Sequence, residues 1–281
     1  MADVKSIPPF IKPLARIRIS SPPHGLRIAV IPDCQVHPGV PIEHLVWCGK
    51  YLALKRPDVI IQLGDFTDLP SLSTHDPVGG LALEGTRYQR DIDYSKSAMG
   101  KFVNELHKVS GWHPHMYLTL GNHEHRIIRT IETTPKLEGI ISLSDLGYTS
   151  FGWKVYPFLQ PIVVGGVCFN HYFPSGVMGR PITSAKALLT KLHMSCVAGH
   201  QQGRDIAFSK RADGIDMTAI IAGSFYSHAE TYLSPYTNNH WRGFFMLHSV
   251  KDGSFDEMAV SIEYLKRRFE GGVPRVKRVR H

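Results

Sequence analysis

The sequence predicts an α/β fold in which two β-sheets pack face to face and helices cover their outer faces, a four-layer α/β/β/α sandwich. In the first half of the chain, apolar runs typical of buried strands alternate with segments of helical periodicity. In the second half, the pattern changes to short successive strands separated by turns. The chain has 281 residues, of which 43% are hydrophobic, and this is enough for a sizeable core.

The first half supplies three strands and the helices between them. The run LRIAVI at 26–31 is rich in β-branched residues and ends at Pro32, as expected of a buried strand. Apolar residues then recur at helical spacing, and two further strand-like runs end near a glycine. The expected elements are a strand at 26–31, a helix at 42–55, a strand at 58–65, a helix at 86–109, a strand at 115–122 and a helix opening at 123.

The second half supplies mostly strands. The expected elements are short strands at 153–160, 161–166 and 167–171, a helix at 184–193 and a strand at 195–200. Four later segments alternate in hydrophobicity and are expected to form an antiparallel series: 204–210, 215–223, 242–250 and 258–265.

The positive charge is concentrated at the C-terminus. The formal net charge is +8, and the segment KRRFEGGVPRVKRVRH at 266–281 carries seven Lys or Arg and one Glu, so the rest is nearly neutral. Such a tail is suited to contact nucleic acid or another polyanion, or it is a solvated terminus. We divide the chain into an N-terminal extension at 1–20, a domain at 21–265 and a basic tail at 266–281.

The sequence contains no segment suited to a membrane. Lys5, Lys12 and several prolines interrupt the N-terminus, which therefore lacks the apolar stretch of a signal peptide. No apolar run is long enough to span a bilayer. The four cysteines lie far apart, without a Cys-x-x-Cys pair, and are expected to be buried free thiols. These features favour a cytoplasmic protein.

Polar residues of metal-binding type follow five of the expected strands directly. In folds of this class, ligands gather at the carboxyl ends of the strands, so these side chains are expected to share one cleft. One such residue alone is more often part of a turn or a helix cap, but five sets at the same topological position favour a common site. The residues are Asp33 and Gln35, Asp65 and Asp68, Asn122 and His123, His171, and finally His200 and Gln202.

Carboxylate, amide and imidazole groups bind divalent cations of intermediate hardness. A carboxylate shared by two ions, with separate ligands for each ion, is an arrangement used for displacement at phosphorus. A glycine precedes Asp65, Asn122 and His200, and a sharp turn there would point each side chain into the cleft. The pattern therefore predicts a metal-dependent site acting on phosphate esters.

These motifs and their order resemble those of the calcineurin-like metallophosphoesterases. That family has, in order, Asp-x-His, Gly-Asp-x-x-Asp, Gly-Asn-His-Asp/Glu, a single His and Gly-His-x-His. The corresponding segments here are DCQ at 33–35, GDFTD at 64–68, GNHE at 121–124, NH at 170–171 and GHQQ at 199–202. The resemblance spans roughly residues 26–265. Segments such as KRPDVIIQLGDFTDLPSLS also resemble members encoded by tailed bacteriophages.

The resemblance implies a role for each matching residue. The metal ligands would be Asp65 as the bridge between two ions, Asn122, His171 and His200 in one site, and Asp33 in the other. His123 would face the phosphate, either as general acid for the leaving oxygen or as a stabiliser of developing charge. A metal-bound hydroxide would attack phosphorus in line.

Two glutamines depart from the family pattern. Gln35 and Gln202 stand where the family has histidines, and both positions belong to the same metal site. A glutamine carbonyl oxygen is a harder and weaker ligand than imidazole. We therefore expect one tight site and one weaker, oxygen-rich site, with Mn²⁺ as the expected ion and Mg²⁺, Zn²⁺, Fe or Ni²⁺ as alternatives. The competing interpretation is that the weaker site is empty and one tight ion suffices.

Four further polar residues have two interpretations each. His37 could replace the missing imidazole or contact substrate, or it is an ordinary loop histidine. Arg180 could contact a phosphate, or it is a surface arginine. Glu124 could orient a histidine or cap the following helix, and His125 is interpreted as lying behind the site or at the surface.

The predicted activity is hydrolysis of phosphate esters, with phosphodiesters favoured over monoesters. The basic tail and the phage-like context favour a nucleotide or nucleic acid as substrate. One alternative is a catalytically weak or inactive binding or scaffold protein, which the two glutamines suggest. Another is a DNA nuclease that uses the tail. No membrane partner is expected, and the expected location is the cytoplasm, that of the host if the protein is phage-encoded.

Overall fold

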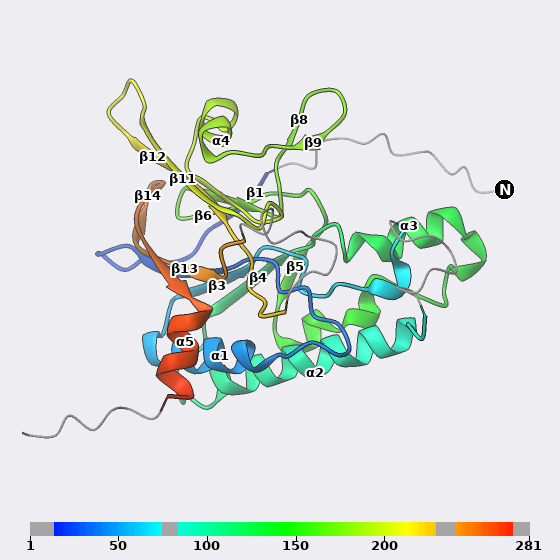
Figure 1. Ribbon diagram of the computed structural model, residues 1–281. Coiled ribbons are helices and arrows are strands. Elements are labelled where there is room, and N and C mark those ends of the chain that lie inside the picture. The colour runs from blue at the N-terminus through cyan, green and yellow to red at the C-terminus, as the bar shows by residue number, and fades with distance from the viewer. Residues whose placement is uncertain (1–13, 75–83, 229–239, 272–281) are drawn as a thin grey trace, which may run out of the picture.

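The computed structural model describes residues 14–74, 84–228 and 240–271. Two six-stranded sheets pack face to face, and helices cover both outer faces (Figure 1). This is the four-layer α/β/β/α sandwich that the sequence predicts, and the fold class is confirmed.

The first sheet combines a parallel centre with an antiparallel edge. Its strands, in spatial order, are β14 (Ser254–Ser261), β13 (Gly243–Lys251), β2 (Leu26–Ile31), β3 (Val59–Gln62), β4 (His115–Thr119) and β5 (Lys154–Tyr156). Strands β2 to β5 run parallel, whereas β13 pairs antiparallel with β2 and β14 pairs antiparallel with β13. The carboxyl ends of β2, β3 and β4 therefore lie at one edge of the sandwich.

The second sheet brings two more strand ends to the same region. Its strands, in spatial order, are β1 (Ala15–Ile17), β6 (Ile162–Val164), β7 (Val167–Asn170), β10 (Cys196–Ala198), β12 (Asp216–Ala222) and β11 (Arg204–Lys210). Strands β7, β10 and β12 run parallel to one another. A short hairpin of β8 (Pro174–Ser175) and β9 (Arg180–Pro181) follows β7.

The helices divide between the two outer faces (Figure 1). Helices α1 (Glu43–Lys55), α2 (Tyr88–His107) and α5 (Ile262–Phe269) cover the first sheet, and α4 (Ala185–Leu192) covers the second. Helix α3 (His125–Thr133) follows β4. Short 3₁₀ turns occupy Pro70–Leu72, Pro135–Leu137, Leu143–Leu146 and Tyr148–Phe151.

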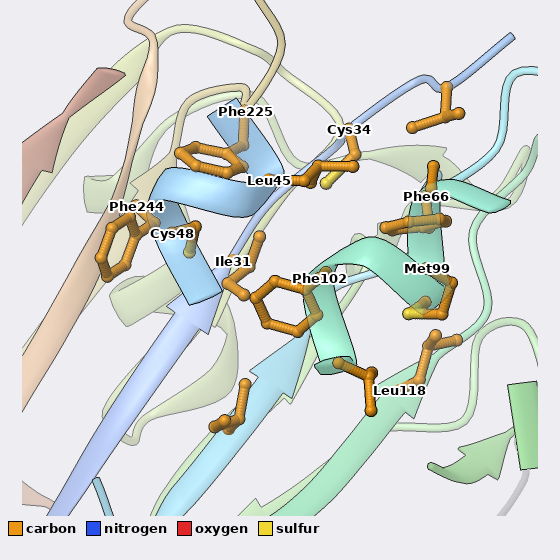
Figure 2. Close-up of a cluster of buried hydrophobic side chains, with 14 of the residues drawn as sticks. Ile31, Cys34, Leu45, Cys48, Phe66, Met99, Phe102, Leu118, Phe225 and Phe244 are labelled. Carbon is orange, nitrogen blue, oxygen red and sulfur yellow. The ribbon is translucent and has the colours of Figure 1, made fainter. Parts of the chain in front are cut away.

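Both faces of β2 are buried, because the strand lies in the middle of the sandwich. Ile28 and Val30 face the apolar layer between the two sheets, while Ala29 and Ile31 face the helices. Figure 2 shows the helix-side layer, where Ile31 lies near Phe102 of α2. Complete burial of such side chains contributes about 1.5–3 kcal/mol each, which anchors the strands whose ends carry the site.

The strand and helix predictions hold for most of the chain, with two corrections. The segment 258–265 was expected to be a strand, but β14 ends at Ser261 and α5 begins at Ile262. The hydroxyl of Ser261 accepts a hydrogen bond from the backbone N–H of Tyr264, which caps that helix. The late strands form two antiparallel pairs, β11 with β12 and β13 with β14, but not one continuous series, since the two pairs lie in different sheets.

The chain ends are partly integrated into the sandwich. Residues 15–17, within the expected extension, form β1 and pair with β6, and α5 continues past residue 265. Residues 272–281 of the basic tail lie outside the described residues, so the domain division stays a prediction. In the described part of the chain, no helix combines the length and apolar character needed to cross a membrane. All four cysteines are buried free thiols, as predicted.

Candidate metal centre

Five strand ends from both sheets converge on one site. Within three residues of the ends of β2, β3, β4, β7 and β10 lie, in that order, Asp33, Asp65, Asn122, His171 and His200. Backbone hydrogen bonds join the loops, since the N–H groups of residues 34 and 35 both donate to the Asp65 carbonyl at 2.9 Å. The N–H of Gly199 likewise donates to the His171 carbonyl at 2.9 Å. The convergence expected from the sequence is therefore present in the structure.

His171 lies at the centre of this group and is completely buried. Its Nδ1 lies 2.9 Å from the Leu63 carbonyl oxygen, which fixes the proton of a neutral ring on that nitrogen. Its Nε2 then points its lone pair at Asn122 Oδ1, 2.8 Å away, and at Asp65 Oδ2, 3.2 Å away. Three electron-pair donors facing one another require a proton or a cation between them. This arrangement fits a divalent ion.

The carboxylates around the centre favour a positive charge beside His171, which a cation or a proton would supply. Burial alone would lower the pKa of His171, but the Asp65 carboxylate outweighs it and raises the pKa to about 9. Burial would raise the pKa of Asp65, yet His123 and His171 hold it below its ordinary value. Burial, followed by the neighbouring His171, lowers the pKa of His200 to about 4, so this imidazole is neutral at pH 7 and able to coordinate.

Asp65, His171 and His200 form the group best placed to hold an ion. One ligand atom from each lies within 4.8 Å of the others. Asn122 adds its side-chain oxygen through the contact with His171. Imidazole, carboxylate and amide ligands of this kind suit Zn²⁺, Mn²⁺ or Fe²⁺.

Asp33 lies on the other side of His171. Its Oδ1 accepts a hydrogen bond from the backbone N–H of His200 at 2.9 Å and lies 4.0 Å from His171 Nδ1. Its Oδ2 is buried and has no hydrogen-bond partner among the described residues. Burial raises the pKa of this carboxyl to about 7. A buried carboxylate oxygen without a partner is costly unless a cation or a proton neutralises it, so Asp33 also fits a metal ligand.

Four of the candidate ligands adopt left-handed backbone conformations. The φ angles are 44° at Gln35, 49° at Asp65, 67° at His200 and 57° at Gln202. Such conformations cost non-glycine residues of the order of 1 kcal/mol or more, and they gather at functional sites. The strain lies at the candidate ligands themselves, so the surrounding hydrogen bonds must hold them there.

The glycines of the motifs serve two purposes. Gly64 has a φ of 92°, as expected for a sharp turn. Gly121 and Gly199 do not have positive φ, so the prediction that they make sharp turns before Asn122 and His200 is wrong. A methyl group on Gly121 would overlap the Asp65 carboxylate, and one on Gly199 would lie 2.5 Å from Asp33 Oδ1. Glycine is required at both positions because a carboxylate lies directly against the backbone.

Glu124 holds the turn that carries Asp65. Its side chain is completely buried, and Oε2 accepts hydrogen bonds from the N–H groups of Asp65 and Gly121, both at 2.9 Å. Oε1 accepts hydrogen bonds from the N–H groups of Phe66 at 2.8 Å and Thr67 at 3.4 Å, and from Tyr148 Oη at 3.1 Å. Glu124 stands at the N-cap position of α3, but its side chain makes no capping hydrogen bond there and orients no histidine. It fixes the backbone at the candidate bridging ligand.

His123 lies beside the metal ligands and pairs with Asp68. Its Nδ1 is 2.7 Å from Asp68 Oδ1, and its Nε2 is 3.6 Å from Asp65 Oδ2. Arg126 supports this pair, since Nη1 donates to the Asp68 carbonyl oxygen at 2.8 Å. Burial would lower the pKa of His123, but the Asp65 carboxylate and the Asp68 hydrogen bond raise it above its usual value. His123 is therefore placed to donate a proton.

The sequence placed Asp68 in the motif but gave it no role, and it left Arg126 unassigned. The spacing of the Gly-Asp-x-x-Asp segment was the available signal for Asp68. No sequence signal pointed to Arg126, because its contact with Asp68 joins residues 58 positions apart.

The remaining candidates lie around or outside the centre. The side-chain oxygen of Gln202 accepts a hydrogen bond from Tyr226, and Gln35, two residues after Asp33, is buried. The ring of His37 packs edge-on against His228, with centroids 5.3 Å apart. Arg180 is exposed on β9, and no hydrogen bond or ion pair within the described residues joins it to the centre. His125 stacks on Phe158, with ring centroids 4.8 Å apart.

Comparison with solved structures gives a match to a dimetal phosphatase from Danio rerio. The match covers 84% of this chain and 99% of that chain, with 12% sequence identity and a TM-score of 0.40. No family model matches the sequence, and no curated protein is significantly similar to it. The fold assignment therefore stands on the sheet order and the helix layers described above, which form a four-layer α/β/β/α sandwich.

Proposed function

We propose that this protein is a metal-dependent hydrolase of phosphate esters, with phosphodiesters preferred over monoesters. The observation that carries the proposal is the position of the His123–Asp68 pair directly beside the ligand group of Asp65, His171 and His200. A metal-binding group alone would suit a structural ion. A partly buried, carboxylate-paired imidazole next to it adds a group that can transfer a proton.

A divalent ion bound by Asp65, Asn122, His171 and His200 would supply positive charge to a phosphoryl group and make water more acidic. The protein's own residues do the rest. Asp68 fixes the orientation of the His123 ring through Nδ1, so that Nε2 faces the region of Asp65. From there His123 would protonate the leaving oxygen or stabilise charge on the phosphoryl group.

The proposed preference for diesters over monoesters rests only on the sequence, namely on the basic tail and the segments that resemble phage-encoded proteins. We propose Mn²⁺ as the first ion to test, because the ligand set mixes oxygen and nitrogen donors. A DNA nuclease and an inactive binding protein remain the alternatives. The tail that a nuclease would use lies largely outside the described residues.

The test is turnover of bis(p-nitrophenyl) phosphate and of p-nitrophenyl phosphate by metal-stripped protein supplied with Mn²⁺. Hydrolysis should require the ion, and the diester should be the faster substrate. Replacing His123 by Ala should reduce turnover by about 10²-fold or more, the usual contribution of a general acid. Unchanged turnover in the His123→Ala variant would mean that the activity comes from elsewhere, and faster monoester hydrolysis would reverse the substrate order.

A further inference from the structure

The Tyr226 hydroxyl is hydrogen-bonded to the side-chain oxygen that Gln202 would offer to a metal ion. The Tyr226 hydroxyl donates a hydrogen bond to Gln202 Oε1 at 2.7 Å. The same hydroxyl oxygen lies 2.8 Å from His240 Nδ1. A tyrosine hydroxyl has one proton, so when it donates to Gln202 it accepts from the protonated Nδ1 of His240. The three side chains form an ordered chain of hydrogen bonds.

The Tyr226 ring is held firmly in this position. The side chain is completely buried. His228 stacks on the ring with centroids 4.4 Å apart and an interplanar angle of 22°, and the guanidinium of Arg242 lies 5.3 Å from the ring centroid. The backbone next to Tyr226 is also hydrogen-bonded to the candidate centre, because the Phe225 N–H donates to the Asp33 carbonyl at 2.7 Å. The hydroxyl therefore remains directed at Gln202.

The two halves of the candidate centre differ for this reason. On one side, Asp65, His171 and His200 bring their ligand atoms close together. On the other side, Asp33 Oδ2 has no partner among the described residues. The N–H of His200 donates to Asp33 Oδ1, and Gln202, two residues further along the same loop, already has its side-chain oxygen bonded to Tyr226. An ion next to Asp33 would have to share the Gln202 oxygen with the tyrosine hydroxyl, which holds one of its two lone pairs and fixes the direction of the amide, and this lowers the affinity for the ion.

We propose that Tyr226 is a positioning residue that withholds Gln202 from the metal, so that the chain binds one divalent ion tightly and a second only weakly. The inference rests on the proposed function in taking the strand-end residues as an ion site. The two glutamines left open whether the second site is weak or empty, and this inference favours a weak site. Gln202 is part of a hydrogen-bond network with Tyr226 and His240 and does not complete a second ligand set.

The experiment measures Mn²⁺ binding to metal-stripped protein by titration calorimetry, with the Mn²⁺ content after gel filtration as a second readout. The wild-type chain should retain one ion and bind another weakly. Tyr226→Phe keeps the ring and removes the hydroxyl, so the weak step should become about three- to tenfold tighter while the tight step is unchanged. Tyr88→Phe is the matched control, because it removes a hydroxyl bonded to Asp145 and should alter neither step.

A second substitution isolates Gln202. Gln202→Ala should leave the weak step unchanged in the otherwise wild-type chain, and it should abolish the gain in the Tyr226→Phe background. Weaker binding in Gln202→Ala alone would identify Gln202 as a ligand and overturn the inference, as would two equally tight ions in the wild type. If Tyr226→Phe does not fold, Gln202→Ala alone decides between these outcomes.

Failure of this inference and failure of the proposed function give different results. A chain with one tight and one weak ion that hydrolyses no phosphate ester would refute the function alone. A chain that hydrolyses esters but loses weak-ion affinity in Gln202→Ala would refute the inference alone.

Discussion

Replacing Glu124 by glutamine should destabilise the protein strongly, although the two side chains have nearly the same shape. Both carboxylate oxygens of Glu124 accept hydrogen bonds: Oε2 from two backbone N–H groups, and Oε1 from two backbone N–H groups and a tyrosine hydroxyl. A glutamine places an NH₂ group where one of these oxygens was. At least two donors would then face another donor in a completely buried position.

The size of the effect follows from the hydrogen bonds that are lost. Hydrogen bonds to a charged group contribute about 1.5–3 kcal/mol each, so losing two should reduce the free energy of unfolding by about 3–6 kcal/mol. That is a large part of the roughly 5–15 kcal/mol that stabilises a typical domain. Mn²⁺ binding should weaken as well, because the N–H of Asp65 loses its acceptor.

The assay is urea denaturation of the metal-stripped protein, followed by circular dichroism. Glu132→Gln is the matched control, because Glu132 is exposed on the same helix, α3, and its replacement should change the free energy of unfolding by less than about 0.5 kcal/mol. If Glu124→Gln lowers the free energy of unfolding by less than about 1 kcal/mol, the Glu124 carboxylate does not stabilise the turn that carries Asp65.

Four further predictions concern stability and ion binding. Gly100→Ala in α2 should raise the free energy of unfolding by about 0.5–1 kcal/mol, because alanine favours a helix over glycine and the new methyl would make ordinary contact with an aromatic ring at 3.5 Å. Gly121→Ala should abolish tight Mn²⁺ binding in calorimetry, because its methyl would overlap the Asp65 carboxylate. Burial, and then the nearby His228, lowers the pKa of His44 to about 3, so below pH 6.5 the unfolded chain binds a proton that the folded chain does not. Stability from this group should be fully present above pH 6.5 and be lost at up to about 1.4 kcal/mol per pH unit as the pH falls toward 3, and His44→Gln should remove that slope from denaturation curves measured between pH 4 and 7. Ser261→Ala removes the N-cap of α5 and should cost about 1 kcal/mol in thermal unfolding; no loss would show that packing alone starts this helix.

The sequence predicted the order of strands and helices well because most of them bury a continuous apolar surface. Apart from Arg27, the run at 26–31 is apolar, and its buried side chains face the second sheet on one side and the helices on the other. The errors occur where local pattern and packing disagree. Residues 258–265 alternate like a strand, but Ser261 caps a helix whose buried residues, Ile262 and Leu265, pack under α1.

The strand-end residues could also be found without the structure. Each follows an apolar run by one to three residues, and the parallel order of strands brings such ends together. The roles of Glu124 and Gln202 could not be found in this way. Glu124 accepts hydrogen bonds from residues 57–59 positions away, and Gln202 accepts one from a tyrosine 24 positions away.

The hydrophobic pattern of the sequence defines the strand ends, and it is therefore sufficient to find Asp33, Asp65, Asn122, His171 and His200. Their surroundings depend on the tertiary structure. It placed Asp68 against His123, the buried carboxylate of Glu124 behind the Asp65 turn, and a tyrosine hydroxyl on Gln202. The physical reason is that periodicity along a chain records which face of an element is buried, whereas a hydrogen bond depends on the distance and direction between two side chains that only packing brings together.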